Sequence, residues 1–187
     1  MLGKKSNKDG GYVKIIAGKY KGKKIRTPGG STHPMGERER NALFNALGDI
    51  IEGQLVMDLY AGSGAIGIEA LSRGAKFVLF IDKNPKAVDT INKNLRKLGA
   101  YPMYGGAIES DLNITLRTAT DRYPIVIADP PYEEYDPKIA KYIARVVSPH
   151  GALVISHPGE APEIKGFTLL KSSKYARAHL SFYQKND

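Results

Sequence analysis

Short apolar runs alternate with longer amphipathic segments along most of the chain, beginning near residue 54. Short apolar runs are typical of buried strands, whereas apolar residues repeated every three or four positions are typical of helices. The predicted strands cover residues 54–59, 77–81, 101–107, 125–128 and 152–156, and the predicted helices cover residues 67–72, 85–98, 111–118 and 137–147. Because strands alternate with helices, the pattern predicts an α/β fold with a doubly wound, mainly parallel sheet.

Different patterns precede and follow this alternation. Residues 167–171 and 179–183 are apolar runs that we expect to form a C-terminal antiparallel strand pair. Near the other end, apolar and polar residues alternate over residues 12–17, the segment 18–22 (GKYKG) indicates a turn, and residues 23–27 indicate a returning strand. The sequence therefore predicts an N-terminal β-hairpin.

A helix is predicted after the hairpin, from about residue 36 to residue 47. Its expected apolar stripe comprises Ala42, Leu43, Ala46 and Leu47. We expect Arg38 and Arg40 to lie off this stripe, in solvent. The chain then divides into a disordered basic tail (residues 1–11), an extension made of the hairpin and this helix (residues 12–50) and a main α/β domain (residues 51–187).

The composition narrows the class of protein. With 187 residues, 42% hydrophobic and 25% charged, the chain is typical of a soluble globular protein. It has no apolar run long enough to cross a membrane, and its polar, lysine-rich start does not resemble a secretory signal. There is no cysteine and the histidines show no metal-ligand spacing, so we expect no disulfide and no metal site. We expect a cytoplasmic monomer.

The positive charge is concentrated at the start of the chain. The whole chain carries a net charge of +9, and residues 1–30 carry nine lysines and arginines against one acidic residue. A solvated tail is one explanation, but the lysines continue into the predicted hairpin, which favours a nucleic-acid partner. The predicted nucleic-acid contacts are Lys19, Lys21, Lys23, Lys24, Arg26, Arg38 and Arg40.

A glycine-rich loop follows the first predicted strand of the α/β domain. The loop spans residues 58–64 (DLYAGSG) and opens a predicted helix, where glycines allow a tight turn and close approach of a ligand. Such a loop by itself also fits a dinucleotide. Asp82 ends the next strand, 20 residues after Gly62, where a carboxylate accepts hydrogen bonds from ribose hydroxyls in either cofactor class.

Asp58 decides between the two cofactor classes. A carboxylate beside the loop repels a pyrophosphate but attracts the ammonium group of a methionine moiety. A dehydrogenase would also need a second domain, for which the chain leaves little room. The sequence therefore favours S-adenosylmethionine over NAD. The predicted cofactor contacts are Asp58, Tyr60, Ala61, Gly62, Ser63, Gly64, Asp82, Lys83, Ala107, Ile108 and Asp129.

A second motif, Asp129-Pro130-Pro131-Tyr132, follows the predicted strand 125–128 and so lies at the carboxyl edge of the sheet, where ligands bind in open α/β folds. The prolines fix the backbone and remove two N–H donors, so neighbouring carbonyls can accept from a substrate. We expect the Asp129 carboxylate and the Pro130 carbonyl to accept hydrogen bonds from an exocyclic amine of a base. Tyr132 offers a face for stacking, worth roughly 1–3 kcal/mol. These four residues are the predicted catalytic residues.

The tetrad and the glycine loop together resemble those of amino-methyltransferases that act on DNA and RNA. More specifically, residues 15–25 (IIAGKYKGKKI), 33–45 (HPMGERERNALFN) and 80–82 (FID) resemble bacterial 16S ribosomal RNA guanine-N2 methyltransferases of the RsmD type. This resemblance, over residues 13–183, implies a Rossmann-like methyltransferase fold and S-adenosylmethionine as cofactor. It also implies in-line methylation of the N2 amine of an extruded guanine, and ribosomal RNA or the small ribosomal subunit as partner.

The chain departs from the family pattern at three places. The family usually has Arg-Pro-Thr where this chain has His33-Pro34-Met35, and a glutamate where this chain has Asn41. The acidic residue that usually meets the adenine amine has no counterpart at residues 106–108, and Glu109 is the nearest acid. Three alternatives stay open from the residues alone: an adenine-N6 methyltransferase on DNA or RNA, an NAD-dependent oxidoreductase, and a non-catalytic nucleic-acid-binding protein.

Overall fold

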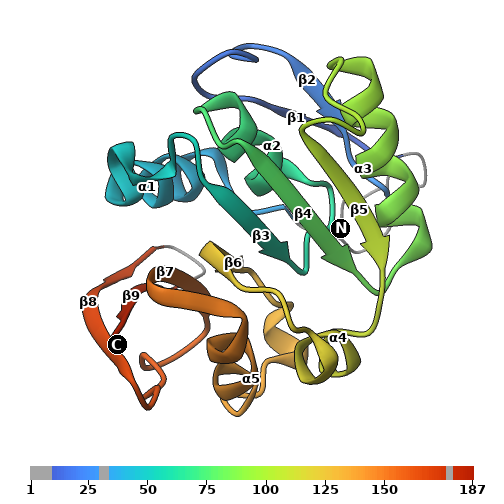
Figure 1. Ribbon diagram of the computed structural model, residues 1–187. Coiled ribbons are helices and arrows are strands. Elements are labelled where there is room, and N and C mark those ends of the chain that lie inside the picture. The colour runs from blue at the N-terminus through green and yellow to red at the C-terminus, as the bar shows by residue number, and fades with distance from the viewer. Residues whose placement is uncertain (1–9, 30–33, 176–178) are drawn as a thin grey trace, which may run out of the picture.

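A seven-stranded sheet forms the centre of the computed structural model, which describes residues 10–29, 34–175 and 179–187 (Figure 1). The strands are β3 (Leu55–Leu59), β4 (Phe77–Asp82), β5 (Gly105–Glu109), β6 (Tyr123–Ala128), β7 (Val147–His157), β8 (Phe167–Lys174) and β9 (His179–Lys185). Their spatial order is β5-β4-β3-β6-β7-β9-β8, in which the strands from β5 to β7 are parallel and β9 runs antiparallel between β7 and β8. The predicted mainly parallel sheet with a C-terminal antiparallel pair is confirmed.

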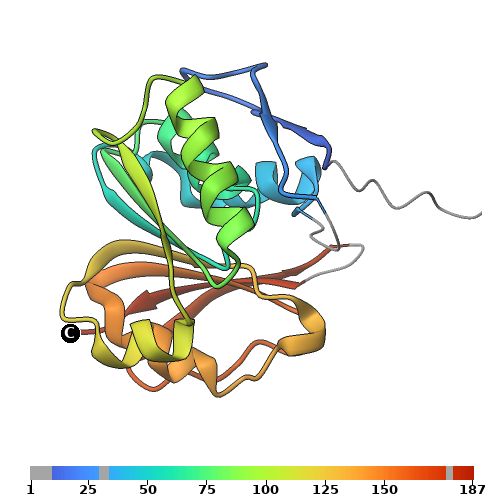
Figure 2. The same ribbon diagram turned by 90° about the vertical axis from the view of Figure 1, so that its right-hand side faces the viewer.

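Helices cover both faces of the sheet (Figure 2). They are α1 (Glu37–Leu47), α2 (Ala65–Ser72), α3 (Pro85–Lys97), α4 (Leu112–Thr118) and α5 (Ile139–Val146), with short 3-10 helices η1 (Gly48–Ile51) and η2 (Tyr132–Glu134). Alternate residues of β3 point to opposite faces of the sheet. Val56 packs in the core that includes residues of α1, α2 and α3, whereas Met57 packs in the core that includes residues of α4 and α5. No helix of the described ranges is long and apolar enough to span a membrane.

The longest helix, α3, shows how the sequence sets its ends. Pro85 stands in the first turn, and the side chain of Asn84 caps the helix by accepting from the Lys86 amide at 3.0 Å. Gly99 follows the helix with a positive φ of 68°. The other predicted elements also occur, and the largest shifts are in two strands: β5 begins at Gly105 rather than residue 101, and β7 covers eleven residues rather than five.

The predicted N-terminal hairpin consists of β1 (Tyr12–Lys14) and β2 (Lys24–Arg26) in antiparallel register. It is bonded to α2 through the buried Glu69, whose two carboxylate oxygens accept from the Ile16 amide at 2.8 Å and the Ala17 amide at 3.0 Å. Arg73 pairs with the same carboxylate at 2.9 Å. The hairpin therefore packs against the end of α2 that is far from the glycine loop.

The tail boundary differs slightly from the prediction. Residues 1–9 lie outside the described residues, as does His33. Gly11, predicted as tail, belongs to the hairpin: its amide donates to the Thr27 hydroxyl at 2.7 Å, and its carbonyl accepts from the Thr27 amide at 3.0 Å.

The predicted role of Arg40 is wrong. Its side chain is buried, 2% exposed, and it donates to the Met35 carbonyl at 2.7 Å and the Lys14 carbonyl at 2.9 Å. The stripe of α1 that faces the core consists of Arg40, Leu43, Phe44 and Leu47, so Ala46 is exposed instead of buried. The segment just before α1 and the hairpin present the Met35 and Lys14 carbonyls to this face of α1, and the guanidinium supplies the donors that those carbonyls need. Arg38 is exposed, as predicted.

Candidate active site

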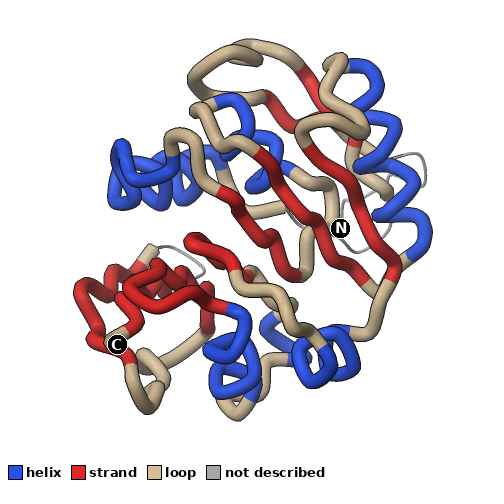
Figure 3. The backbone as a smooth tube through the Cα atoms, viewed as in Figure 1, coloured by secondary structure: helices blue, strands red, loops and turns tan. Residues whose placement is uncertain are grey.

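The loops that follow β3, β4, β5 and β6 gather at the carboxyl edge of the sheet (Figure 3), because parallel strands all end on the same side. The glycine loop after β3 turns sharply: Tyr60, Gly62 and Gly64 have positive φ angles of 60°, 52° and 76°. A Cβ atom on Gly64 would lie 3.0 Å from the Ile91 side chain, so only glycine fits both this conformation and this space.

Asp82 ties the glycine loop to the end of β4. One oxygen of its carboxylate accepts from the Gly62 amide at 2.7 Å, and the other accepts from the Asn84 amide at 2.8 Å. Each carboxylate oxygen has a second lone pair. The half-buried side chain can therefore also accept hydrogen bonds from a pair of hydroxyl groups, as the sequence predicts for a ribose.

Asp58 is fully enclosed beneath this loop, with 1% of its surface exposed. Its Oδ2 atom accepts from the Gly67 amide at 2.9 Å, whereas Oδ1 has no hydrogen-bond partner within the described ranges. Burial raises the pKa of Asp58 to about 8, against the opposing effect of the Gly67 hydrogen bond. A buried acceptor without a donor fits a ligand that brings a cationic donor to the loop.

Asp129 follows β6, and the hydroxyl of Ser156 on the neighbouring strand β7 acts on its carboxyl group. The Tyr132 phenol oxygen lies 2.7 Å from the same Ser156 hydroxyl. Either hydroxyl group can be the donor of this bond. Burial raises the pKa of Asp129 to about 6, while the Ser156 hydrogen bond acts in the opposite direction.

The bond to Ser156 holds the Tyr132 ring at the start of η2, directly after Pro131. The half-buried ring can still stack on a base, but its hydroxyl is also engaged, which the sequence does not predict. Ser156 itself is absent from the predicted site. The signal that could have found it is a hydroxyl at the carboxyl end of the otherwise apolar run 152–156.

The remaining predicted cofactor positions lie at the end of β5. The Ala107 amide donates to the Asn92 side chain at 3.0 Å, and Ile108 is 50% exposed. Because β5 continues to Glu109, the polar pair Ser110-Asp111 lies at the carboxyl edge, and the Ser110 amide donates to the Asp82 carbonyl at 3.0 Å. The predicted strand ends at residue 107, so this pair is absent from the predicted site.

The structure thus brings the predicted cofactor and catalytic residues together and places the hairpin lysines elsewhere. The hairpin turn lies near the amino edge of the sheet, where the Lys19 amide donates to the Ser72 carbonyl at the end of α2. The start of α1 lies nearer the tetrad, since the charge of Glu39 acts on the Tyr132 phenol.

The sheet order, the glycine loop after β3 and the tetrad after β6 define an α/β methyltransferase of the Rossmann-like, S-adenosylmethionine-dependent class. The chain belongs to the family described as "Conserved hypothetical protein 95", whose model matches residues 13–184. This family assignment confirms the resemblance to RsmD-type methyltransferases.

Individual relatives support the same class. "Putative rRNA methyltransferase YlbH" of Bacillus subtilis is 30% identical over 185 residues, 92% of this chain and 99% of that protein. "Ribosomal RNA small subunit methyltransferase D" of Escherichia coli is 35% identical over 133 residues, 69% of this chain and 65% of that protein. The solved structure of "Putative methyltransferase yhhF" from Escherichia coli superposes with a TM-score of 0.85 at 26% identity, covering 94% of this chain and 99% of that one.

Proposed function

We propose that this protein transfers the methyl group of S-adenosylmethionine to the N2 amine of a guanine in small-subunit ribosomal RNA. The observation that carries the proposal is the group of Asp129, Ser156 and Tyr132 at the same sheet edge as the glycine loop, in which Tyr132 and Ser156 are hydrogen-bonded. The ribosomal specificity is supported by the relatives named above, of which one is named for the small ribosomal subunit. The guanine specificity follows only from the resemblance to the RsmD-type methyltransferases.

The residues at the carboxyl edge fit this cofactor. The unpartnered Oδ1 of Asp58 suits the methionine ammonium group, directly or through one water, and the Asp82 carboxylate suits the ribose hydroxyls. Residues 60–64 would line the methionine part and Lys83, Ala107 and Ile108 the adenosine part, with Ser110 and Asp111 available to the adenine edge. When bound, the cofactor supplies an electrophilic methyl group on a sulfonium.

The tetrad would hold the base for an in-line attack. Asp129 and the Pro130 carbonyl accept hydrogen bonds from the two N–H groups of the amine, and these bonds fix the direction of the nitrogen lone pair. The Asp129 carboxylate receives the proton that the amine loses. The Tyr132 ring stacks on the base after it has left its helical stack. Holding two reactants in line can lower a barrier by about 7–11 kcal/mol, so orientation supplies most of the rate enhancement.

The exposed basic residues of the extension would bind RNA phosphates. Lys19, Lys21, Lys23, Lys24 and Arg26 are exposed on the hairpin, and Arg38 is exposed at the start of α1, closer to the tetrad. Phosphate contacts position an RNA without reading its sequence. We therefore assign these residues to substrate positioning rather than to base selection.

The test is methyl transfer from labelled S-adenosylmethionine to ribosomal RNA and to small ribosomal subunits from a strain that lacks the enzyme. Digestion to nucleosides should yield N2-methylguanosine. Appearance of N6-methyladenosine would replace guanine by adenine as the target. Calorimetry should show binding of S-adenosylmethionine and none of NAD, and the opposite result would refute the cofactor assignment.

A further inference from the structure

An exposed turn of the main domain lies outside both the cofactor site and the tetrad. Residues 101–104 (YPMY) connect α3 to β5 at the amino edge of the sheet, where the Tyr104 carbonyl accepts from the Val78 amide at 3.1 Å. Its large side chains face solvent: Tyr101 is 38% exposed, Met103 is 74% exposed and Tyr104 is 40% exposed. Three large apolar side chains in one exposed turn are typical of an interaction site.

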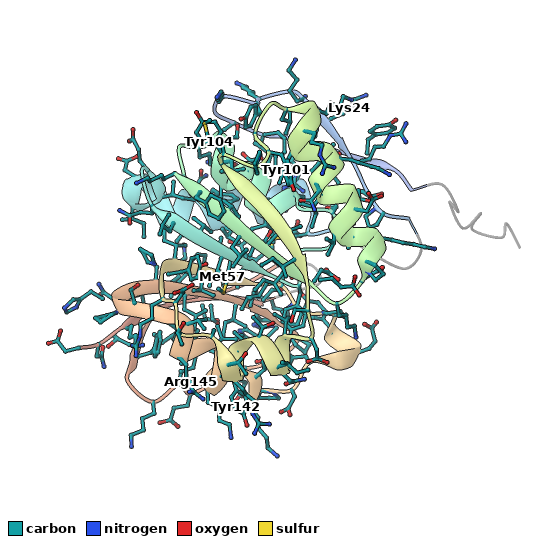
Figure 4. The ribbon with its side chains drawn as sticks, turned by 45° about the vertical axis from the view of Figure 1, so that its right-hand side comes forward. Lys24, Met57, Tyr101, Tyr104, Tyr142 and Arg145 are labelled. Atoms are coloured by element: carbon teal, nitrogen blue, oxygen red, sulfur yellow. The ribbon has the colours of Figure 1, made fainter. Side chains whose placement is uncertain are left out.

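Cations stand over both tyrosine rings. The Arg96 guanidinium carbon lies 4.3 Å from the centre of the Tyr101 ring, and the Lys19 ammonium nitrogen lies 5.4 Å from the centre of the Tyr104 ring. Lys19 belongs to the hairpin turn, so it joins the two segments into one surface. Figure 4 shows Lys24, Tyr101 and Tyr104 at the same end of the molecule. We name Lys19, Lys24, Arg96, Tyr101 and Tyr104 the aromatic-basic surface.

We propose that the aromatic-basic surface binds unpaired nucleotides of the RNA substrate, with bases stacked on the tyrosine ring faces that the cations leave free and phosphates against the cations. The inference rests on the proposed function for the identity of the RNA. Charge favours a nucleic acid, because residues 1–30 carry nine basic residues and one acidic residue. The rings favour unpaired nucleotides, because only splayed bases expose a face on which an aromatic side chain can stack.

The position of the surface sets what it does. It lies at the amino edge of the sheet and the tetrad lies at the carboxyl edge, separated by the length of β4, six residues or roughly 20 Å. A short fragment around the target guanine cannot reach both. The surface therefore increases the affinity for long RNA and leaves the methyl-transfer step itself unchanged.

The chain offers a matched control for the rings. Tyr142 is a half-buried tyrosine on α5 with the Lys141 ammonium 4.8 Å from its ring centre, and Figure 4 shows it with Arg145 at the opposite end of the molecule from Tyr101. The double variant Tyr101→Ala with Tyr104→Ala should weaken binding of 16S ribosomal RNA at least about tenfold, since each stacked base contributes roughly 1–3 kcal/mol. Tyr142→Ala should bind like the wild type, and Tyr101→Phe with Tyr104→Phe should retain the affinity.

The contribution of the Arg96 cation is tested with a matched control as well. Arg96→Gln should reduce by about one the slope of the logarithm of the association constant for 16S ribosomal RNA against the logarithm of the salt concentration, whereas Arg145→Gln should not change this slope. Methyl transfer to an oligonucleotide of a few residues should be equal in all variants. Thermal unfolding midpoints are recorded for each variant, and the Phe variants keep the test decisive if the Ala variant is unstable.

Two results would overturn the proposal. One is wild-type affinity of the double Ala variant for 16S ribosomal RNA. The other is a loss of binding to assembled small subunits with unchanged binding to free RNA, which would assign the surface to a ribosomal protein. If the wild type methylates no RNA, the proposed function fails, but the binding constants still decide whether this surface holds RNA.

Discussion

Replacing Asp129 with asparagine should abolish most of the methyl-transfer activity and leave cofactor affinity nearly unchanged. Asparagine has the same size but cannot ionise, and it presents an NH2 donor where the carboxylate accepts from Ser156 and from the base amine. A positioned acid or base typically contributes a factor of about 10² to 10⁴, so a loss of that order is expected.

The same carboxylate should control the pH profile. Burial raises the pKa of Asp129 to about 6, so the carboxyl loses its charge as the pH falls through that value. A group with this pKa is about nine-tenths protonated at pH 5, so the wild-type rate should fall about tenfold between pH 7.5 and pH 5. The residual activity of Asp129→Asn should be flat over this range. Since the Ser156 hydrogen bond lowers the pKa of Asp129, Ser156→Ala should shift the wild-type inflection to higher pH.

The assay is single-turnover methyl transfer at saturating cofactor from pH 5 to pH 8, with calorimetry for cofactor binding and thermal unfolding as the control for folding. Tyr132→Ala and Tyr132→Phe complete the series: the first removes the stacking face, the second only the bond to Ser156. The reasoning is refuted if Asp129→Asn is as active as the wild type, or if the wild-type rate is flat between pH 5 and pH 7.5.

Three further predictions test the fold and the site. Burial raises the pKa of Asp58 from 3.8 to about 8, so the folded state holds this proton more tightly and its stability falls as the pH rises between these two values. Asp58→Asn should reduce this fall in thermal unfolding experiments and weaken S-adenosylmethionine binding about tenfold. Equal affinity of the variant and the wild type would exclude Asp58 from the cofactor site. Gly67→Ala should lower the unfolding free energy in urea by about 1–3 kcal/mol, because the added Cβ would lie 2.2 Å from the Phe80 ring, whereas Gly106→Ala, with open space around it, should not. Arg40→Ala should lower the unfolding free energy by about 1–3 kcal/mol, because it leaves two carbonyls without donors. Arg38→Ala should leave stability unchanged and weaken RNA binding. If Arg40→Ala instead weakens RNA binding without loss of stability, Arg40 belongs to the RNA site.

Much of the site follows from the sequence, because the order of strands fixes where their ends lie. Once residues 54–59 and 125–128 are recognised as parallel strands, Asp58 and Asp129 must end at the same edge. The glycine loop and the tetrad could therefore be placed together without knowledge of the sheet order. The observed pairing of β3 with β6 brings them onto adjacent strands.

Other features depend on contacts that the sequence does not encode locally. Ser156 reaches Asp129 only because Ile155 pairs with Ala128 in the register of β7 against β6. Arg40 faces inward because the hairpin, far away in the sequence, presents the Lys14 carbonyl to it. Residues 101–104 are predicted as the start of a strand, but the Tyr104 amide donates to the Ala100 carbonyl and closes a turn instead.

The buried Glu69 makes the hairpin inseparable from the rest of the fold. Its carboxylate holds the hairpin amides at one end of α2, and Gly64 caps the same eight-residue helix at the other end. Excising the hairpin would leave this charge without its amide donors and would loosen the helix that shapes the glycine loop. A related protein that receives this hairpin must therefore also receive its α2 partners, Glu69 and Ser72.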